Sequence, residues 1–230
     1  MSANTMPMPP VQAAPEGAEP RSTPSETLRK ALLLCGVISS LLYVAMNIYV
    51  PMQWEGYSFA SQVVSELSAV GAPTRELWVR LGIPYTVLVI AFGWGVWMSA
   101  GRNRALHVVG GVFIVDGLIG PFWPPMHLRG AEMTMTDTLH IVFTGVWLLL
   151  MLVALGFAAA ALGRRFRAYS IATLAIFLVF GALTGMDGAR IAADLPTPWA
   201  GVWERINIGA MVLWTSVLAV ALLRPAGRAT

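Results

Sequence analysis

Charged residues are scarce in this 230-residue chain, where only 12% are Asp, Glu, Lys or Arg and 57% are hydrophobic. Soluble domains carry about 25% charged residues. A chain this apolar has too few polar side chains to cover a water-exposed surface, so we expect its surroundings to be a lipid bilayer. The net charge of +3 forms no basic stripe with interleaved aromatic residues, and neither a nucleic-acid partner nor a particular protein partner is indicated.

Cysteine and the common catalytic motifs are also lacking. The single cysteine, Cys35, lies in the first apolar segment, which excludes an intrachain disulfide, a Cys-x-x-Cys redox pair and a c-type haem site. We interpret it as a small buried hydrophobic residue. The sequence contains no Walker A loop, no Gly-x-Ser-x-Gly elbow and no His-Glu-x-x-His zinc motif.

Long apolar runs dominate what is present. About 20 helical residues cross roughly 30 Å of hydrocarbon, and a lone strand would leave its backbone groups unpaired there. The sequence therefore predicts an all-α polytopic membrane protein with a six-transmembrane-helix bundle. The predicted spans are about 29–51, 76–99, 104–123, 137–162, 168–185 and 204–223.

The chain divides into a membrane domain and two ends. Residues 1–27 are rich in Pro, Ala, Ser and Glu, cannot bury enough apolar surface to offset ordering, and are predicted to be a disordered cytoplasmic tail. They lack the apolar stretch of a signal peptide. Residues 28–225 form the predicted transmembrane domain, and residues 226–230 are its cytoplasmic C-terminal end.

Arginine placement predicts the orientation. If the N-terminus is cytoplasmic, most Arg residues and the only lysine, Lys30, fall on the inner side, as the positive-inside rule requires. We therefore expect a multi-pass protein of a bacterial inner membrane with both termini in the cytoplasm. The three longer connections, about 52–75, 124–136 and 186–203, then lie outside, where function is expected to concentrate.

The first outer connection is predicted to contain a short amphipathic helix, about 59–70. Apolar residues recur there at helical spacing: Phe59, Val63, Leu67 and Val70. Gly71 and Pro73 would end the helix, which should lie flat on the membrane or over the bundle. Glu66 borders the apolar side, so we expect it to face lipid or protein more than open water.

Asp137 and His140 are the main candidates for chemistry. Their i, i+3 spacing places them on one face of the fourth helix, and His127 precedes them in the second outer connection. With one further ligand these residues could bind zinc or another divalent ion. They could equally form an acid–base pair or a structural hydrogen bond. No haem is expected, because only His127 and His140 approach the matched depth that bis-histidine ligation requires.

Asp116 lies inside the third apolar run. Intramembrane acids are costly and are functional candidates by default. The structural alternative is that Gly117 and Gly120 allow close helix approach, so that Asp116 bonds a neighbouring backbone or an arginine. A structural role is also the default expectation for Arg205, in an ion pair with Glu204.

Four stretches resemble a known family: SELSAVGAPT at 65–74, PMHLRG at 125–130, TDTLH at 136–140 and WERINIG at 203–209. Together they are similar to the bacterial and archaeal membrane family called domain of unknown function 998, over about residues 30–224. The resemblance implies a multi-helix membrane protein and supplies no mechanism. Asp116 lies outside these motifs.

The leading hypothesis is a metal-assisted hydrolase or transferase that acts on lipid-like substrates at the outer leaflet. His127, Asp137 and His140 would bind the metal, which would activate water, and Glu66, Asp137 and His140 would serve as acid–base groups. An anionic head group would be held by arginines: Arg129, Arg190 and Arg205. The alternatives are a non-catalytic interaction or assembly protein and, less favoured, a small proton-coupled transporter that uses Asp116.

Overall fold

The computed structural model describes residues 23–224, and seven α-helices lie in this range. They are α1 (Pro24–Tyr49), α2 (Arg75–Ser99), α3 (Arg104–Ile119), α4 (Met135–Ala161), α5 (Arg164–Met186), the short α6 (Gly188–Ala192) and α7 (Ala200–Leu223). Three short 3-10 helices, η1 (Pro51–Gln53), η2 (Val64–Ser68) and η3 (Gly120–Phe122), lie in the connections. No strand occurs within residues 23–224 beyond one isolated bridge between Val70 and His127.

Six helical segments are long and apolar enough to cross a membrane, which confirms the predicted all-α, six-span architecture. The first helix begins earlier than expected. Thr23 caps it by accepting a hydrogen bond from the Glu26 backbone N–H, so residues 24–27 are helical rather than part of a tail. Residues 1–22 of the predicted disordered tail, and the predicted C-terminal end at 226–230, lie outside the described residues.

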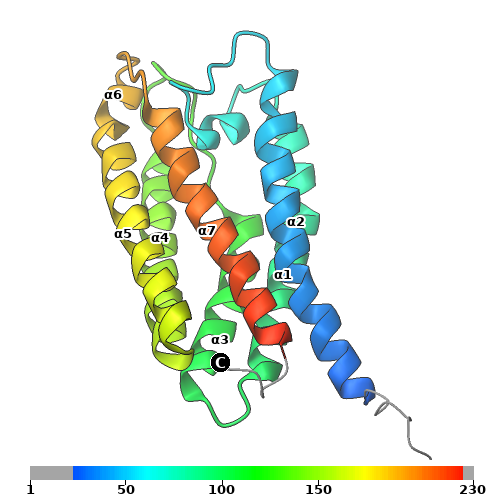
Figure 1. Ribbon diagram of the computed structural model, residues 1–230. Helices are drawn as coiled ribbons and strands as arrows, with labels where there is room; N and C mark the ends of the chain where they lie inside the picture. Colours follow the sequence, from blue (N-terminus) through cyan, green and yellow to red (C-terminus); the bar gives the residue numbers. More distant parts are fainter. Residues whose placement is uncertain (1–22, 225–230) are drawn as a thin grey trace, which may run out of the picture.

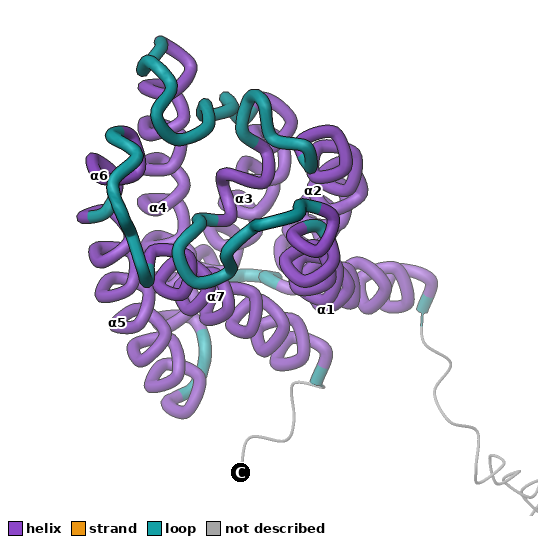
Figure 2. Tube along the Cα trace, turned by 90° about the horizontal axis from the view of Figure 1, so that it is seen from above, coloured by secondary structure: helices purple, strands orange, loops and turns teal. Residues whose placement is uncertain are grey.

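The six long helices form a ring in the order α1, α2, α3, α4, α5 and α7, and α7 packs back against α1 to close it. Figure 1 shows the start of α1, the end of α7 and the two short connections at one end of the ring, which we call the short-loop end. The other end carries residues 50–74, 120–134 and 187–199, and we call it the long-loop end. Figure 2 shows the ring from that end.

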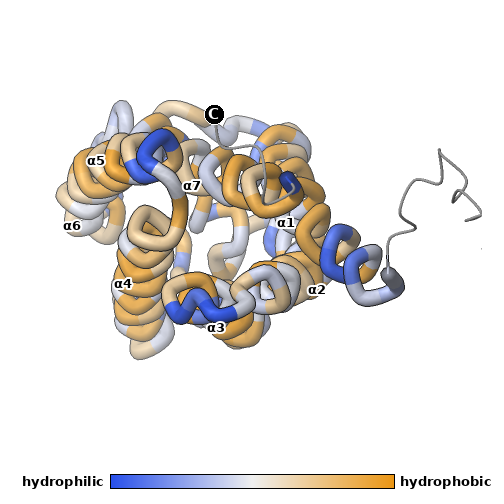
Figure 3. The backbone as a smooth tube through the Cα atoms, turned by 60° about the horizontal axis from the view of Figure 1, so that its bottom comes forward, coloured by the Kyte–Doolittle hydropathy of each residue, from blue (hydrophilic) through white to orange (hydrophobic). Residues whose placement is uncertain are grey.

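Hydropathy follows this arrangement. Figure 3, in which the short-loop end comes forward, shows hydrophilic residues at the helix ends there and hydrophobic residues along the helices. Apolar side chains that face away from the ring are widely exposed, for example Leu41 at 64%, Leu149 at 63% and Leu213 at 58%. Such an apolar exterior suits lipid and would be unfavourable in water.

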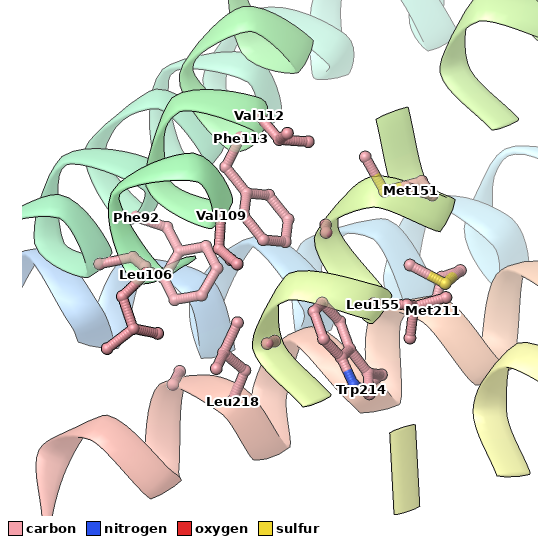
Figure 4. Close-up of a cluster of buried hydrophobic side chains, with 14 of the residues drawn as sticks. Phe92, Leu106, Val109, Val112, Phe113, Met151, Leu155, Met211, Trp214 and Leu218 are labelled. Atoms are coloured by element: carbon pink, nitrogen blue, oxygen red, sulfur yellow. The ribbon is translucent and has the colours of Figure 1, made fainter. Parts of the chain in front are cut away.

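A packed core fills the ring near the short-loop end. Phe92, Phe113, Leu155, Trp214 and Leu218 meet there from four helices and are at most 4% exposed (Figure 4). The rings of Phe92 and Phe113 stand edge-to-face, with centroids 4.8 Å apart. Because lipid is as apolar as these side chains, it is close packing that holds the helices together here.

The first long connection differs from the predicted amphipathic helix at 59–70, of which only η2, Val64–Ser68, is helical. The reason lies in competing hydrogen bonds. The Gln62 carbonyl accepts from the Tyr57 hydroxyl at 3.2 Å and from Arg205 Nη1 at 3.1 Å, and the Ser61 carbonyl accepts from the Arg129 guanidinium at 2.7 Å. These side chains take carbonyl groups that a continuous helix would have used.

Candidate functional site

Glu66 lies under the loops at the long-loop end, where it is 0% exposed. Its carboxylate pairs with Arg129 through two parallel bonds, Nε to Oε1 at 2.6 Å and Nη2 to Oε2 at 2.9 Å. The Arg129 guanidinium also donates to the Thr197 hydroxyl at 2.7 Å, and Thr197 donates to the Ser61 carbonyl at 2.9 Å. Residues from all three long connections are thereby joined, and we call this set the loop clasp.

Charge in the loop clasp is fully compensated. The hydrogen bonds to Glu66 raise the pKa of Arg129 above its ordinary value, so the guanidinium stays protonated. The Glu66 carboxylate also accepts the Val63 backbone N–H at 2.7 Å. The prediction that Glu66 faces protein is confirmed, but its lone pairs are occupied by donors. The arrangement suits a structural role for Glu66 and Arg129.

The other two predicted anion-binding arginines also bind backbone. Arg205 Nη1 lies within hydrogen-bonding distance of three carbonyls, those of Phe59, Gln62 and Gly201, and its Nη2 donates to the Tyr57 hydroxyl at 2.8 Å. Burial raises the pKa of Tyr57 to about 12, so this phenol keeps its proton. Arg190 donates twice to the Pro196 carbonyl, at 3.0 and 2.6 Å.

Asp137 and His127 form a second loop contact at the start of α4. The Asp137 carboxylate accepts the backbone N–H groups of Thr134 and His127, at 2.8 and 2.6 Å, and contacts His127 Nδ1 at 2.9 Å. Asp137 thus closes a capping box with Thr134 and ties the second long connection to the helix. Of the alternatives for this residue, the geometry matches the structural hydrogen bond.

His140 does not join His127 and Asp137. Its Nδ1 lies 2.7 Å from the Pro124 carbonyl, and because a carbonyl only accepts, Nδ1 carries a proton, so in the neutral ring the lone pair is on Nε2. The Trp123 indole N–H lies 3.2 Å from the same Nδ1, a longer contact that the protonated nitrogen cannot accept. Within residues 23–224 no group of three or more His, Cys, Asp or Glu residues is placed to hold a metal ion.

A large cavity opens beneath the loops, with a volume of about 630 Å³. All six long helices and the first long connection contribute to its wall. Its polar lining lies toward the long-loop end and includes Arg75, Asp116, His140, Glu204 and Asn207. Of the residues predicted as catalytic, metal-binding or anion-binding, only His140 lines this cavity.

The two carboxyl groups in the cavity differ in their partners. Glu204 accepts hydrogen bonds from the Val64 backbone N–H and, at 3.4 Å, from the Ser65 hydroxyl. Asp116 has no hydrogen bond or ion pair to any described side chain or backbone group. The expected ion pair between Glu204 and Arg205 is not formed, because adjacent residues on a helix point in different directions.

The floor of the cavity is apolar. Val89, Phe113, Met151 and Met211 line it, and each is at most 4% exposed. These residues belong to the core cluster that fills the ring toward the short-loop end. The cavity therefore occupies the long-loop half of the bundle and ends on packed side chains.

The mouth of the cavity includes the outward face of α2. Val79 and Ile83 line the cavity and are 51% and 61% exposed, so it reaches the molecular surface along this helix. Pro121, which also lines the cavity, is exposed as well. The opening thus lies on the outer surface of a helix that is long and apolar enough to span a membrane.

The sequence marks Asp116 as an intramembrane acid, but nothing in it places Asp116 in a cavity with the other polar residues. Arg75 and Tyr43 carried no signal, because an arginine at a helix start and a tyrosine in an apolar run are ordinary features of membrane helices. Asn207 was visible as a polar residue at the start of the last helix. Its membership of the cavity depends on how α7 packs against α5.

These features define a six-helix membrane protein with a large polar-and-apolar cavity in one half of the bundle. The chain belongs to the family described as protein of unknown function (DUF998), whose model matches residues 37–221. This confirms the resemblance seen in the sequence. No curated protein and no solved structure was found to match the chain.

Proposed function

We propose that this protein binds a lipid-like amphiphile, drawn from the bilayer, in the cavity beneath its loops. The observation that carries the proposal is the cavity's two-part lining, with polar groups toward the long-loop end and an apolar floor of Val89, Phe113, Met151 and Met211. A volume of about 630 Å³ lies within the range of small-molecule sites, about 300–1,000 Å³. An amphiphile would place its head among the polar groups and its chain against the floor.

The exposed apolar rim supports entry from the membrane. Val79 and Ile83 belong both to the cavity wall and to the exposed surface of α2. A ligand that crosses this rim can keep its chain among apolar groups throughout, which avoids the cost of exposing it to water. Packed side chains close the cavity toward the short-loop end, which supports binding of a ligand and gives no path for it through the protein. The proton-coupled transporter hypothesis is therefore less favoured.

Hydrolysis or transfer on the bound amphiphile is a second candidate, favoured by His140. Its Nδ1 is held by the Pro124 carbonyl, which leaves Nε2 as the basic nitrogen of a residue that lines the cavity. A positioned imidazole with a free lone pair can act as a general base. This version uses no metal and does not involve Glu66 or Asp137. A purely interacting or assembly protein is the remaining alternative, and it would leave the cavity without a ligand.

We further propose that the long-loop end faces outward from a bacterial inner membrane and that both termini are cytoplasmic. The support is the cluster of arginines at the short connections: Arg102, Arg104, Arg164, Arg165 and Arg167. Single cysteines placed at Glu132 and at Arg102, in a Cys35→Ser background, would test this with a membrane-impermeant maleimide. In intact cells, we expect labelling at position 132 and none at position 102. The opposite pattern would reverse the orientation.

Binding can be tested by photo-crosslinking. The protein in lipid nanodiscs would be exposed to a long-chain diazirine probe, and labelled peptides would be mapped by mass spectrometry. We expect labels on cavity-lining segments of α4 and α7, reduced by Thr144→Phe, which fills the cavity. The matched control is Val146→Phe on the same helix, since Val146 is 45% exposed and does not line the cavity. Labelling restricted to outward faces, unchanged in Thr144→Phe, would overturn the proposal.

A further inference from the structure

The polar end of the cavity contains more negative than positive groups. Among the described residues that line it, Asp116 and Glu204 are the carboxyl groups, and Arg75 is the one arginine or lysine. Arg75 donates to the Ser68 carbonyl at 3.2 Å, and the nearby Arg205 is committed to backbone carbonyls and to the Tyr57 hydroxyl. No ion pair to either carboxyl group is formed within residues 23–224.

Two side chains at this end have acceptor oxygens without a donor among the described residues, Asp116 and Asn207. Asp116 has no hydrogen-bond partner among the described residues, and both bonds to Glu204 come from uncharged donors. Asn207, which is 6% exposed, donates its amide to the Phe177 carbonyl at 3.0 Å while its Oδ1 is buried without a partner. Buried acceptors without donors are costly, so a ligand that supplies donors would be stabilised here.

Aromatic rings surround the same region. Tyr43, Tyr85, Trp78 and Trp147 line the cavity, and Tyr43 packs against Trp78 and Tyr85 with ring centroids 5.8 and 4.9 Å apart. Tyr43 therefore lines the same cavity as Asp116 and Glu204. Aromatic faces attract cations, and the two carboxyl groups disfavour an anion.

From these contacts we infer that the amphiphile carries a protonated amine as its head group, bound at the polar end of the cavity that Asp116 and Glu204 line. An ammonium group has N–H donors and no acceptor, which complements the unpaired acceptors of Asp116 and Asn207. Its charge also compensates carboxyl groups that would be costly to ionise unpaired in the membrane. This inference rests on the proposed binding of an amphiphile and specifies its chemical class.

The test compares probes that share one chain and differ in the head. Dodecylamine, dodecanol and dodecanoate would each be titrated against the diazirine probe on the full-length protein in nanodiscs. A charged hydrogen-bonded contact in a low-dielectric site should make dodecylamine compete at least about tenfold better than dodecanol. The isosteric variant Asp116→Asn should lose most of this preference and bind dodecanol as the wild type does. The matched control, Glu76→Gln, changes an exposed carboxylate outside the cavity and should keep the full preference.

Each other outcome is decisive. Equal competition by dodecylamine and dodecanol would overturn the amine assignment while leaving amphiphile binding intact. Preferential competition by dodecanoate would point to Arg75 and also overturn it. An unchanged preference in both Asp116→Asn and Glu204→Gln would show that the amine is bound elsewhere. Failure of every probe to bind would instead remove the proposed function itself.

Discussion

Arg129 and Glu66 meet across a sequence separation of 63 residues, with two parallel hydrogen bonds of 2.6 and 2.9 Å between guanidinium and carboxylate. The Glu66 side chain is 1% exposed and that of Arg129 is 14% exposed. This pair joins the first and second long connections, which also meet at the bridge between Val70 and His127, and the Thr197 hydroxyl extends the link to the third. The loops above the cavity are thus held together by a charge pair whose two residues, judged from the sequence alone, could equally be catalytic.

Removing one partner of this pair should destabilise the protein strongly. Arg129→Ala leaves the Glu66 carboxylate buried and unpaired, a change that typically costs about 3–5 kcal/mol. We expect a lower melting temperature in detergent, measured by the change in intrinsic tryptophan fluorescence on heating. Arg80→Ala serves as the control, since its pair with Glu76 is 73% and 78% exposed and should contribute little. Equal losses of thermal stability in Arg129→Ala and Arg80→Ala would contradict a stabilising role for the loop clasp.

Asp137→Asn should loosen the second long connection without unfolding the bundle. The variant weakens the bonds from the backbone N–H groups of Thr134 and His127, and loss of a helix cap typically costs about 0.5–2 kcal/mol. Hydrogen exchange should rise at residues 127–138 and stay unchanged in α2. Glu132→Gln, an exposed change in the same connection, is the control. Protection that matches the wild type at 127–138 would show that Asp137 does not hold this segment.

Metal content should not depend on His127 and His140. His127 contacts Asp137, whereas His140 bonds the Pro124 carbonyl, and no group of three ligands forms within residues 23–224. Elemental mass spectrometry of the wild type and of the His127→Ala/His140→Ala double variant should therefore give the same content of zinc, iron and manganese. A near-stoichiometric metal that disappears in the double variant would restore the metal-assisted hydrolase as the leading hypothesis.

Gly93 should not tolerate a side chain. A Cβ added there would lie 2.8 Å from the Gly110 carbonyl oxygen, so α2 and α3 would have to separate. Overpacking of this kind typically costs about 1–3 kcal/mol. We expect Gly93→Val to lower the melting temperature and the yield of monodisperse protein. Gly145→Val on α4 is the matched control, because nothing lies within 4 Å of its added Cβ. A wild-type melting temperature for Gly93→Val would argue against this helix contact.

The sequence alone determined the architecture, because the physics that sets it is local. Any run of about 20 apolar residues must be helical to satisfy its backbone in lipid, so the six spans could be counted from composition and length. Helix ends were predicted to within a few residues, except where η2 replaced a longer helix. There, side chains distant in sequence, Arg129 and Arg205, compete for the carbonyls of residues 59–62.

The roles of individual polar residues were decided only by the tertiary structure. Apolar helices in lipid carry little pairing signal, so the sequence could not show that α7 closes the ring against α1 or that Asp116, His140, Glu204 and Asn207 share one cavity. The sequence does not show whether a given carboxylate or arginine binds a ligand or a neighbouring loop. Glu66 and Arg129 pair with each other and hold the loops together, whereas Asp116 has no partner within residues 23–224 and lines the cavity.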